Sequence, residues 1–220
     1  RTARGQEQRN PQTTVWQDFS AGLRYLLGWP GLLIICLMTV GINFTIIPAF
    51  SLLPLMVKDY FGGDALQLGW VESAMGIGVF AGGALLGVWG GFKRKILTSM
   101  LGLMGMGAGT LILALAPASI LSLAVGGAFL VGLANPLTMG PFMAVLQSTV
   151  EPDMQARVLS LLWSIGGGMA PIGLMVAGPV ADQVGIQAWF YLGGALCIFM
   201  GLVGLCIPAV MKIEAKREAA

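Results

Sequence analysis

Six long apolar stretches, separated by short polar segments, limit what this chain of 220 residues can fold into. A helix needs about 20 apolar residues to cross the hydrocarbon core of a bilayer. Hydrophobic residues make up 56% of the chain and charged residues 10%, whereas soluble domains carry roughly 25% charged residues. We therefore predict an all-α membrane protein with six transmembrane helices. The predicted spans are about 30–57, 67–91, 96–116, 119–146, 158–181 and 188–210.

The positive charges lie almost entirely on one side of this pattern, and Lys58 alone falls on the other side. Cytoplasmic loops accumulate Lys and Arg, so we expect the crowded side, with both chain ends, to face the cytoplasm. The cations of that side are Arg1, Arg4, Arg9, Arg24, Lys93, Arg94, Lys95, Arg157, Lys212, Lys216 and Arg217. Four of them lie on internal loops, where they set the topology or form a cytoplasmic gate. These four are Lys93, Arg94, Lys95 and Arg157.

The polar segments at the two ends divide the chain into four parts. Residues 1–14 are polar and charged, and we predict that they form a cytoplasmic linker. Within 15–28, apolar side chains recur at helical spacing, which favours an amphipathic helix lying at the membrane surface. The six-helix bundle would occupy 29–211, and 212–220 would be a cytoplasmic tail.

The composition disfavours several classes of function. The net charge of +2 is small and the cations flank the spans, so the expected partner is the lipid bilayer and not a nucleic acid. The chain has no His, which removes the commonest metal ligand and general base. Its three Cys residues lie inside spans without paired spacing, so we predict no disulfide, metal or cofactor. No nucleophile–base pair or phosphate-binding loop stands out, and an enzyme is not expected.

The first and fourth predicted spans share a pattern of polar residues and prolines that the other spans lack. Asn43 precedes Pro48 in the first span, and Asn135 precedes Pro136 and Pro141 in the fourth. Proline frees backbone carbonyls, which are tolerated in a membrane where they are buried or line a wet cavity. Matching interrupted helices in two halves of a chain indicate a transporter binding site. The alternative is that the two Asn side chains only bond to neighbouring helices.

The residues around these prolines are the candidate contacts to a bound substrate. The predicted polar contacts are Asn43, Thr45, Ser51, Asn135 and Thr138. The predicted apolar contacts are Phe44, Phe50 and Met139. The first and fourth spans would then line the substrate cavity.

Glu72 is the only carboxylate clearly within a predicted span, about two turns from its outer end. An ionisable side chain inside a membrane is a functional candidate by default, because placing it there is costly. A buried carboxylate could carry a proton, so we predict that Glu72 is a proton-coupling residue. The alternative is a solvated or hydrogen-bonded residue at the rim of the bundle.

Glycines recur at intervals of four residues inside the spans, as with Gly78 and Gly82 in the second span and Gly105 and Gly109 in the third. Small residues let membrane helices approach each other closely. The pattern predicts close helix packing, which is either static or allows helices to slide during a transport cycle.

Several short stretches resemble one branch of the major facilitator superfamily. The segments Trp16–Leu26, Phe50–Lys58 and Leu68–Ser73 are similar to segments around its seventh and eighth helices. The segment Pro152–Val158 is similar to its inner loop, and Gly178–Asp182 is similar to the end of its eleventh helix. That branch comprises bacterial macrolide-efflux-like drug:proton antiporters and the enterobactin exporter.

This resemblance implies the C-terminal half of a twelve-helix fold, built from three-plus-three inverted repeats. It implies a secondary active transporter that exports amphipathic drugs or natural products across the bacterial inner membrane by proton-coupled alternating access. The partners would be the N-terminal six-helix half, a small amphipathic substrate and protons. The alternatives are another cargo, such as a siderophore or lysophospholipid, or a membrane adaptor that transports nothing.

Two positions depart from the pattern of the family. Gly91 stands where an Asp normally precedes the basic cluster of the inner loop. Ala156 stands where a Gly usually precedes the Arg of the second inner loop. Without that Asp, an acid-based charge latch at the first loop is not expected.

Overall fold

The computed structural model describes Arg24 and residues 27–211. Of the predicted surface helix at 15–28, only three residues are described. The predicted linker at 1–14 and the predicted tail at 212–220 lie outside the described residues.

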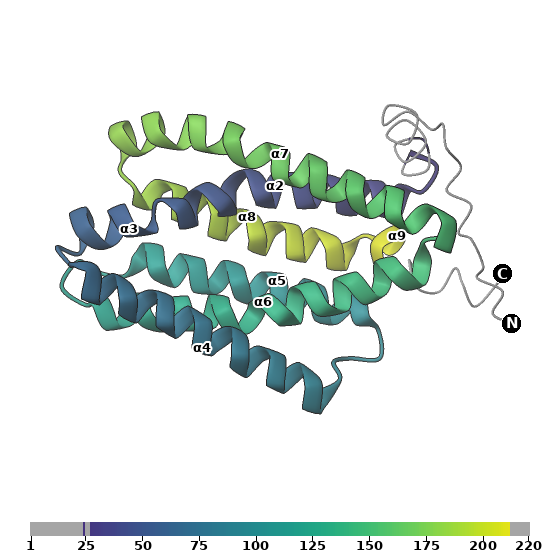
Figure 1. The fold of residues 1–220 in the computed structure, drawn as a ribbon, viewed down its shortest axis with the longest axis horizontal. Helices are drawn as coiled ribbons and strands as arrows, with labels where there is room; N and C mark the ends of the chain where they lie inside the picture. The colour runs from purple at the N-terminus through teal and green to yellow at the C-terminus, as the bar shows by residue number, and fades with distance from the viewer. Residues whose placement is uncertain (1–23, 25–26, 212–220) are drawn as a thin grey trace, which may run out of the picture.

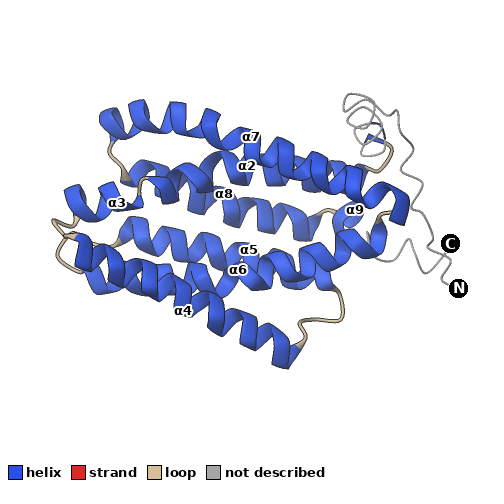
Figure 2. Ribbon diagram, in the orientation of Figure 1, coloured by secondary structure: helices blue, strands red, loops and turns tan. Residues whose placement is uncertain are grey.

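Six helices of the described chain are long and apolar enough to cross a membrane, as predicted (Figures 1 and 2). They are α2 (Pro30–Ser51), α4 (Ala65–Trp89), α5 (Lys95–Leu115), α6 (Leu121–Thr149), α7 (Pro152–Val184) and α8 (Gln187–Cys206). Three short elements complete the described fold: α3 (Leu53–Leu55), the π-helix η1 (Met56–Tyr60) and α9 (Pro208–Met211). The chain is therefore an all-α, multi-pass membrane protein.

Proline and short polar side chains set several helix starts. Pro30 and Pro152 occupy the first turns of α2 and α7, where a missing N–H breaks no intrahelical hydrogen bond. A capping box starts α4: the Asp64 carboxylate accepts from the Leu66 N–H at 2.8 Å, and the Gln67 side chain accepts from the Asp64 N–H at 2.9 Å. These local signals fix where α2, α4 and α7 begin.

The first predicted span, 30–57, is not one continuous helix. The α-helix α2 ends at Ser51, and the chain then continues through α3 into η1. Pro54 accounts for the interruption, because it has no N–H to donate to the carbonyl one turn earlier. The π-helical turns that follow absorb the resulting change of register at the end of the span.

The connection after the fourth long helix is shorter than predicted. The spans predicted at 119–146 and 158–181 belong to longer helices, α6 and α7, and only Val150 and Glu151 separate them. Pro152 starts α7 immediately after this turn, because proline suits the first helical position. The sequence underestimated these helices because polar residues near their ends were assigned to a loop.

The order in which the helices pack differs from their order in the chain. Neighbours in space follow the sequence α4, α6, α5, α8, α2, α7, and Figure 1 shows α4 and α7 on opposite sides of the bundle. The contacts of α6 with α4 and α5 correspond to the contacts of α2 with α7 and α8, while α5 and α8 contact each other. Exchanging α2–α4–α5 with α6–α7–α8 therefore reproduces the packing, as expected for the predicted three-plus-three inverted repeats.

Glycines allow the closest approach between α4 and α6. Gly78 lies against the backbone of Phe129, and Gly82 lies against the backbone of Leu133. A Cβ atom at Gly82 would also fall 2.8 Å from Cγ of Pro136, which is closer than van der Waals contact. Backbone thus packs on backbone, as small residues permit in a membrane.

Candidate functional site

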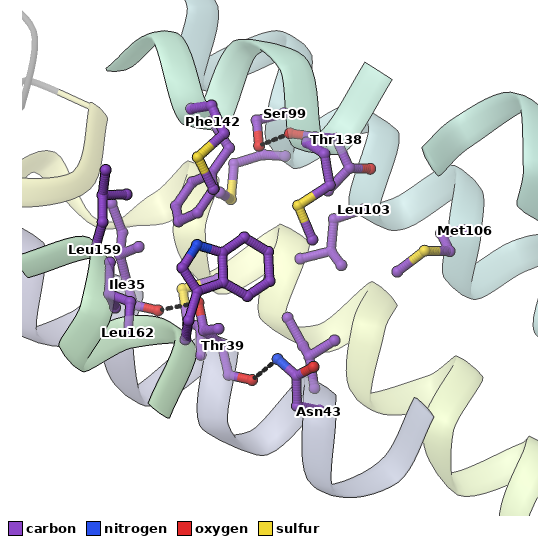
Figure 3. A pocket seen from close by; sticks show the side chains of 16 residues that line it. Ile35, Thr39, Asn43, Ser99, Leu103, Met106, Thr138, Phe142, Leu159 and Leu162 are labelled. Carbon is purple, nitrogen blue, oxygen red and sulfur yellow. Dashed lines mark hydrogen bonds between the residues drawn. The ribbon is translucent and has the colours of Figure 1, made fainter. Parts of the chain in front are cut away.

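An apolar cavity of about 80 Å³ lies between the two inverted repeats (Figure 3). Residues of α2 and α5 from the first repeat, and of α6 and α7 from the second, line this inter-repeat cavity. Its wall consists of aliphatic, methionine and aromatic side chains with four uncharged polar side chains, and none of the described residues that line it is charged. The methionines of the wall are Met38, Met100, Met106, Met139 and Met143.

The inter-repeat cavity reaches from the inner part of the bundle to the middle of the membrane. We use "inner end" for the end at which α2, α5 and α7 begin, which is the side predicted to face the cytoplasm. Asn43, Met106 and Trp163 follow those helix starts by 11 to 13 residues. At a rise of about 1.5 Å per residue they lie roughly 16–20 Å from the inner end. The hydrocarbon core is about 30 Å thick, so these side chains lie near its midplane.

The hydroxyl groups of the cavity wall donate hydrogen bonds to backbone carbonyls of the protein. Thr39 donates to the Ile35 carbonyl at 2.9 Å, and Thr138 donates to the Ala134 carbonyl at 2.8 Å. Ser99 of α5 donates to the Thr138 carbonyl of α6 at 2.8 Å, which ties the two repeats together beside the cavity. These hydrogen bonds satisfy the hydroxyl donors and leave the wall largely apolar.

Asn43 is the remaining polar side chain of the wall. Its Nδ2 donates to the Thr39 carbonyl at 2.8 Å, as Figure 3 shows. Gly166 of α7 lies beside it, since a Cβ atom there would fall 3.3 Å from Asn43 Nδ2. Among the described residues no donor bonds to the Asn43 carboxamide oxygen, so this oxygen can accept a hydrogen bond from a bound molecule.

The structure brings together three of the eight predicted substrate contacts. Asn43, Thr138 and Met139 line the inter-repeat cavity. Asn135 is exposed on α6, and Ser51 is exposed at the end of α2, where its hydroxyl donates to the Ile47 carbonyl at 2.9 Å. Neither of these two side chains lines the cavity.

The other three predicted contacts pack inside the bundle, away from the cavity. Thr45 is buried and its hydroxyl bonds to carbonyls of its own helix at 3.2 Å. The Phe44 ring lies against Trp189 and the Phe50 ring against Phe190, each with a centroid separation of 6.1 Å. These two aromatic pairs hold α2 against α8.

Several cavity residues were not predicted from the sequence. Ser99 and Met100 come from the third long helix, α5, which was not expected to contribute, and Trp163 was not among the predicted contacts. A signal was present, because a hydroxyl residue stands beside a methionine three times. These neighbours are Met38-Thr39, Ser99-Met100 and Thr138-Met139. Each is followed at helical spacing by further apolar residues of the wall.

The predicted ionisable residues all lie away from the cavity. Glu72 is exposed on α4 near the outer end, and Lys93, Arg94 and Lys95 are exposed where α5 begins. Arg157 is half-buried on α7, and its guanidinium lies 3.8 Å from the Met154 sulfur. The roles predicted for these five residues remain predictions.

A membrane bundle built from two inverted repeats, with a cavity at their interface near the midplane, has the architecture of a secondary transporter half. The sequence model of the Major Facilitator Superfamily matches residues 31–220. This chain belongs to that superfamily.

Efflux proteins are among the similar curated proteins. Macrolide efflux protein A of Streptococcus pyogenes is 30% identical over 91% of this chain and 49% of its own length. Its namesake from Enterococcus faecalis is 30% identical over 72% of this chain and 49% of its own length. Multidrug efflux pump Tap of Mycolicibacterium fortuitum is 26% identical over 69% of this chain and 36% of its own length.

The chain spans about half the length of the curated relatives it matches most strongly. No solved structure matches it.

Proposed function

We propose that this chain is the C-terminal half of a proton-coupled exporter of amphipathic drugs or natural products in the bacterial inner membrane. The observation that carries the proposal is the inter-repeat cavity, whose methionine-rich wall reaches the midplane. Substrate sites of secondary transporters lie at that depth and at the interface between repeats. The names of the similar efflux proteins support an efflux role.

The size of the cavity supports a second half as partner. Drug-sized ligands occupy pockets of roughly 300–1,000 Å³, whereas the inter-repeat cavity holds about 80 Å³. A whole cargo therefore needs a further wall, which the N-terminal six-helix half would supply. Exposed apolar side chains on α4 and α7, such as Phe80 and Met175, offer surface for this half or for lipid.

Alternating access would open the cavity to the two sides of the membrane in turn. The outer ends of the helices are tied in this structure: the Tyr60 hydroxyl donates to the Ala116 carbonyl at 3.2 Å, and the Gln187 side chain donates to the Ala114 carbonyl at 3.3 Å. The inter-repeat cavity lies on the inner side of these ties. This arrangement supports a state of the half that is closed at its outer end.

An export assay with the full-length gene tests the proposed function. Cells that lack their main efflux pumps would express the gene and be loaded with a panel of macrolides, siderophores and lysophospholipids. We expect lower accumulation of macrolides or other amphipathic drugs than in cells with an empty vector. Altered accumulation of only a siderophore or a lysophospholipid would replace the cargo, and no altered cargo would favour the adaptor alternative.

Proton coupling through Glu72 has its own test. Glu72→Gln removes the titratable group while keeping the size of the side chain, so we expect export to lose its dependence on the proton gradient. Substrate efflux from proteoliposomes would be measured across a range of external pH. Ser73→Ala, next to Glu72 and also exposed, is the matched control. Unchanged pH dependence in Glu72→Gln would reject the coupling role.

A further inference from the structure

We propose that the inter-repeat cavity is a dry subsite for an uncharged aromatic or aliphatic group of the cargo, and that any cationic group of the cargo stays outside it. The inference rests on the proposed function, because it assigns a ligand chemistry to the same transport site. It concerns one part of the cargo, since the cavity volume of about 80 Å³ accommodates a small ring or branched group.

The hydrogen bonding of the wall excludes strongly polar ligands. The hydroxyls of Thr39, Ser99 and Thr138 all donate to backbone carbonyls. A polar ligand would lose its hydrogen bonds to water on entering the cavity. The wall offers mainly the Asn43 carboxamide oxygen as a new partner, and unpaired polar groups are costly to bury. Cavities with apolar walls stay dry and bind apolar guests.

The lack of a counter-ion in the wall disfavours a cation. Among the residues that the structure describes, none that lines the cavity carries a carboxylate, and Glu72 lies on α4, which contributes no residue to the wall. A cation placed there would lose its hydration without gaining a counter-ion. The charged part of an amphipathic cargo must therefore lie beyond the cavity, towards the second half of the transporter.

The side chains of the wall suit rings of varied shape. Methionine is flexible and polarisable, and its sulfur makes favourable contacts with aromatic rings. Five methionines line the cavity together with Phe142 and Trp163. Met139 is 40% exposed and Trp163 is 60% exposed, whereas Leu103 and Leu162 are buried in the wall. Met139 and Trp163 thus form the rim, and the two leucines form the floor.

Filling the floor tests the subsite. The full-length transporter would be purified and titrated with N-phenylnaphthylamine, a neutral aromatic dye, and with ethidium, an aromatic cation. Leu162→Phe and Leu103→Phe each add volume at the floor, so we expect at least about tenfold weaker dye binding, as loss of a buried ring implies. The matched controls are Leu174→Phe on α7 and Leu101→Phe on α5, which are both exposed.

Comparing the two dyes shows whether the cavity prefers a neutral ring to a charged one. Ethidium binding should change less than N-phenylnaphthylamine binding in both floor variants, because the positive charge of ethidium is spread over its fused rings and keeps those rings outside the cavity. Equal weakening by the floor variants and their exposed controls, or no weakening at all, would overturn the subsite. Displacement of the neutral dye by excess phospholipid and not by a macrolide would overturn it too, because the occupant would then be a lipid chain.

A spectroscopic measurement does not depend on the floor variants being folded. Trp163 lies at the rim, so it should transfer excitation energy to bound N-phenylnaphthylamine more efficiently than distant tryptophans do. Trp163→Phe should lower the sensitised dye emission more than Trp89→Phe, a matched change at an exposed tryptophan near the inner end. Equal losses would place the dye elsewhere. Export that persists after a failed binding test rejects only the subsite, whereas a confirmed subsite without export rejects the proposed function.

Discussion

Gly90 and Gly91 set the backbone conformation of the inner loop between α4 and α5. Their φ angles are 75° and 78°, so both residues adopt the left-handed conformation that ends α4. The loop then turns toward α5, where the Thr98 hydroxyl accepts from the Phe92 N–H at 2.9 Å. Gly91 therefore stands in place of the Asp of the family pattern at a position where side chains are disfavoured.

Replacing Gly91 tests this backbone explanation. Gly91→Ala should destabilise the protein by about 1–2 kcal/mol, because a left-handed residue with a Cβ atom is strained. The new Cβ atom would also fall 2.9 Å from the Thr98 hydroxyl oxygen. The measurement is the thermal unfolding of the purified full-length transporter.

Gly91→Asn is the control for that experiment. Asn carries a Cβ atom but tolerates the left-handed conformation better than Ala. We expect a smaller loss of stability than for Gly91→Ala. Equal losses for the two variants would mean that the space beside Thr98, and not the backbone angle, requires glycine.

The burial of Trp189 could not be predicted from its position in the sequence. Trp189 lies at the outer start of the sixth predicted span, where the indole N–H of a tryptophan ordinarily finds a polar partner at the membrane interface. The structure buries Trp189 at 3% exposure against Phe44, and its Nε1 has no hydrogen-bond partner among the described residues. The position of a tryptophan along a predicted span indicates its depth in the membrane. It does not distinguish an interfacial side chain from one that packs between α2 and α8, because both lie at the same depth.

At the scale of helices, each inverted repeat contains a glycine that faces a proline of the neighbouring helix. Gly173 of α7 lies against Phe44 and Pro48 of α2, and Gly82 of α4 lies against Leu133 and Pro136 of α6. Since α7 and α4 occupy equivalent places in the two repeats, so do these two contacts. Gly173 thus packs on the Phe44 carbonyl, which lacks its usual donor because Pro48 has no N–H, and Gly82 packs on the Leu133 carbonyl beside Pro136.

These contacts leave no room for a larger side chain. Gly173→Ala would place a Cβ atom 2.5 Å from the Phe44 carbonyl oxygen and 2.6 Å from Pro48 Cγ. Overpacking of this kind costs about 1–3 kcal/mol, so we expect the variant to unfold at a lower temperature. The same loss should follow from Gly82→Ala, which overlaps α6 in the equivalent way.

Neighbouring glycines serve as controls for the two contacts. Gly178 of α7 and Gly83 of α4 have nothing within 4 Å of an added Cβ atom. Alanine there should leave stability unchanged or raise it by up to about 1 kcal/mol, because Ala favours a helix. Comparable losses at all four positions would show that glycine matters for flexibility of the chain and not for these contacts.

The helices could be predicted from the sequence, but most of the site could not. Hydropathy and helix-end residues such as Pro30 and Asp64 act locally, so six helices follow from short segments of sequence. Asn43 and Thr138 were found because prolines mark their helices. Ser99 and Trp163 were missed because their place in the wall depends on how α5 and α7 pack, which no local pattern encodes.

At the scale of the whole molecule, the two ends of the bundle differ. At the outer end, the last carbonyls of α5 accept hydrogen bonds from two directions, from Tyr60 after the first span and from Gln187 at the start of α8. The helices α6 and α7 make few contacts along their lengths, and the inter-repeat cavity lies partly between them. Separating the outer helix ends would break both ties, while separating the inner ends would break the Ser99–Thr138 bond and the bonds from the Gln155 side chain to the Gln147 and Val150 carbonyls.

Loosening the outer ties should shift this balance towards opening at the outer end. Tyr60→Phe keeps the ring that packs edge-on against Phe61 at 4.9 Å but removes the hydroxyl bonded to Ala116. A hydrogen bond contributes about 1 kcal/mol net, so the population open at the outer end should rise about fivefold. Tyr191→Phe on the exposed face of α8 is the matched control.

The shift can be measured from outside the membrane in full-length transporter reconstituted into liposomes. The variant Val57→Cys, with the three native cysteines replaced, places a thiol at an outer-end position that is buried in this structure. A membrane-impermeant maleimide should label this thiol faster in Tyr60→Phe than in the parent or in Tyr191→Phe, because the reagent reaches it when the outer end opens. Gln187→Ala should act in the same direction, since it removes the second tie to α5. Labelling rates that match the parent in both variants would mean that these hydrogen bonds do not hold the outer end closed, and that its closure depends on the packing of Phe50 and Phe190 instead.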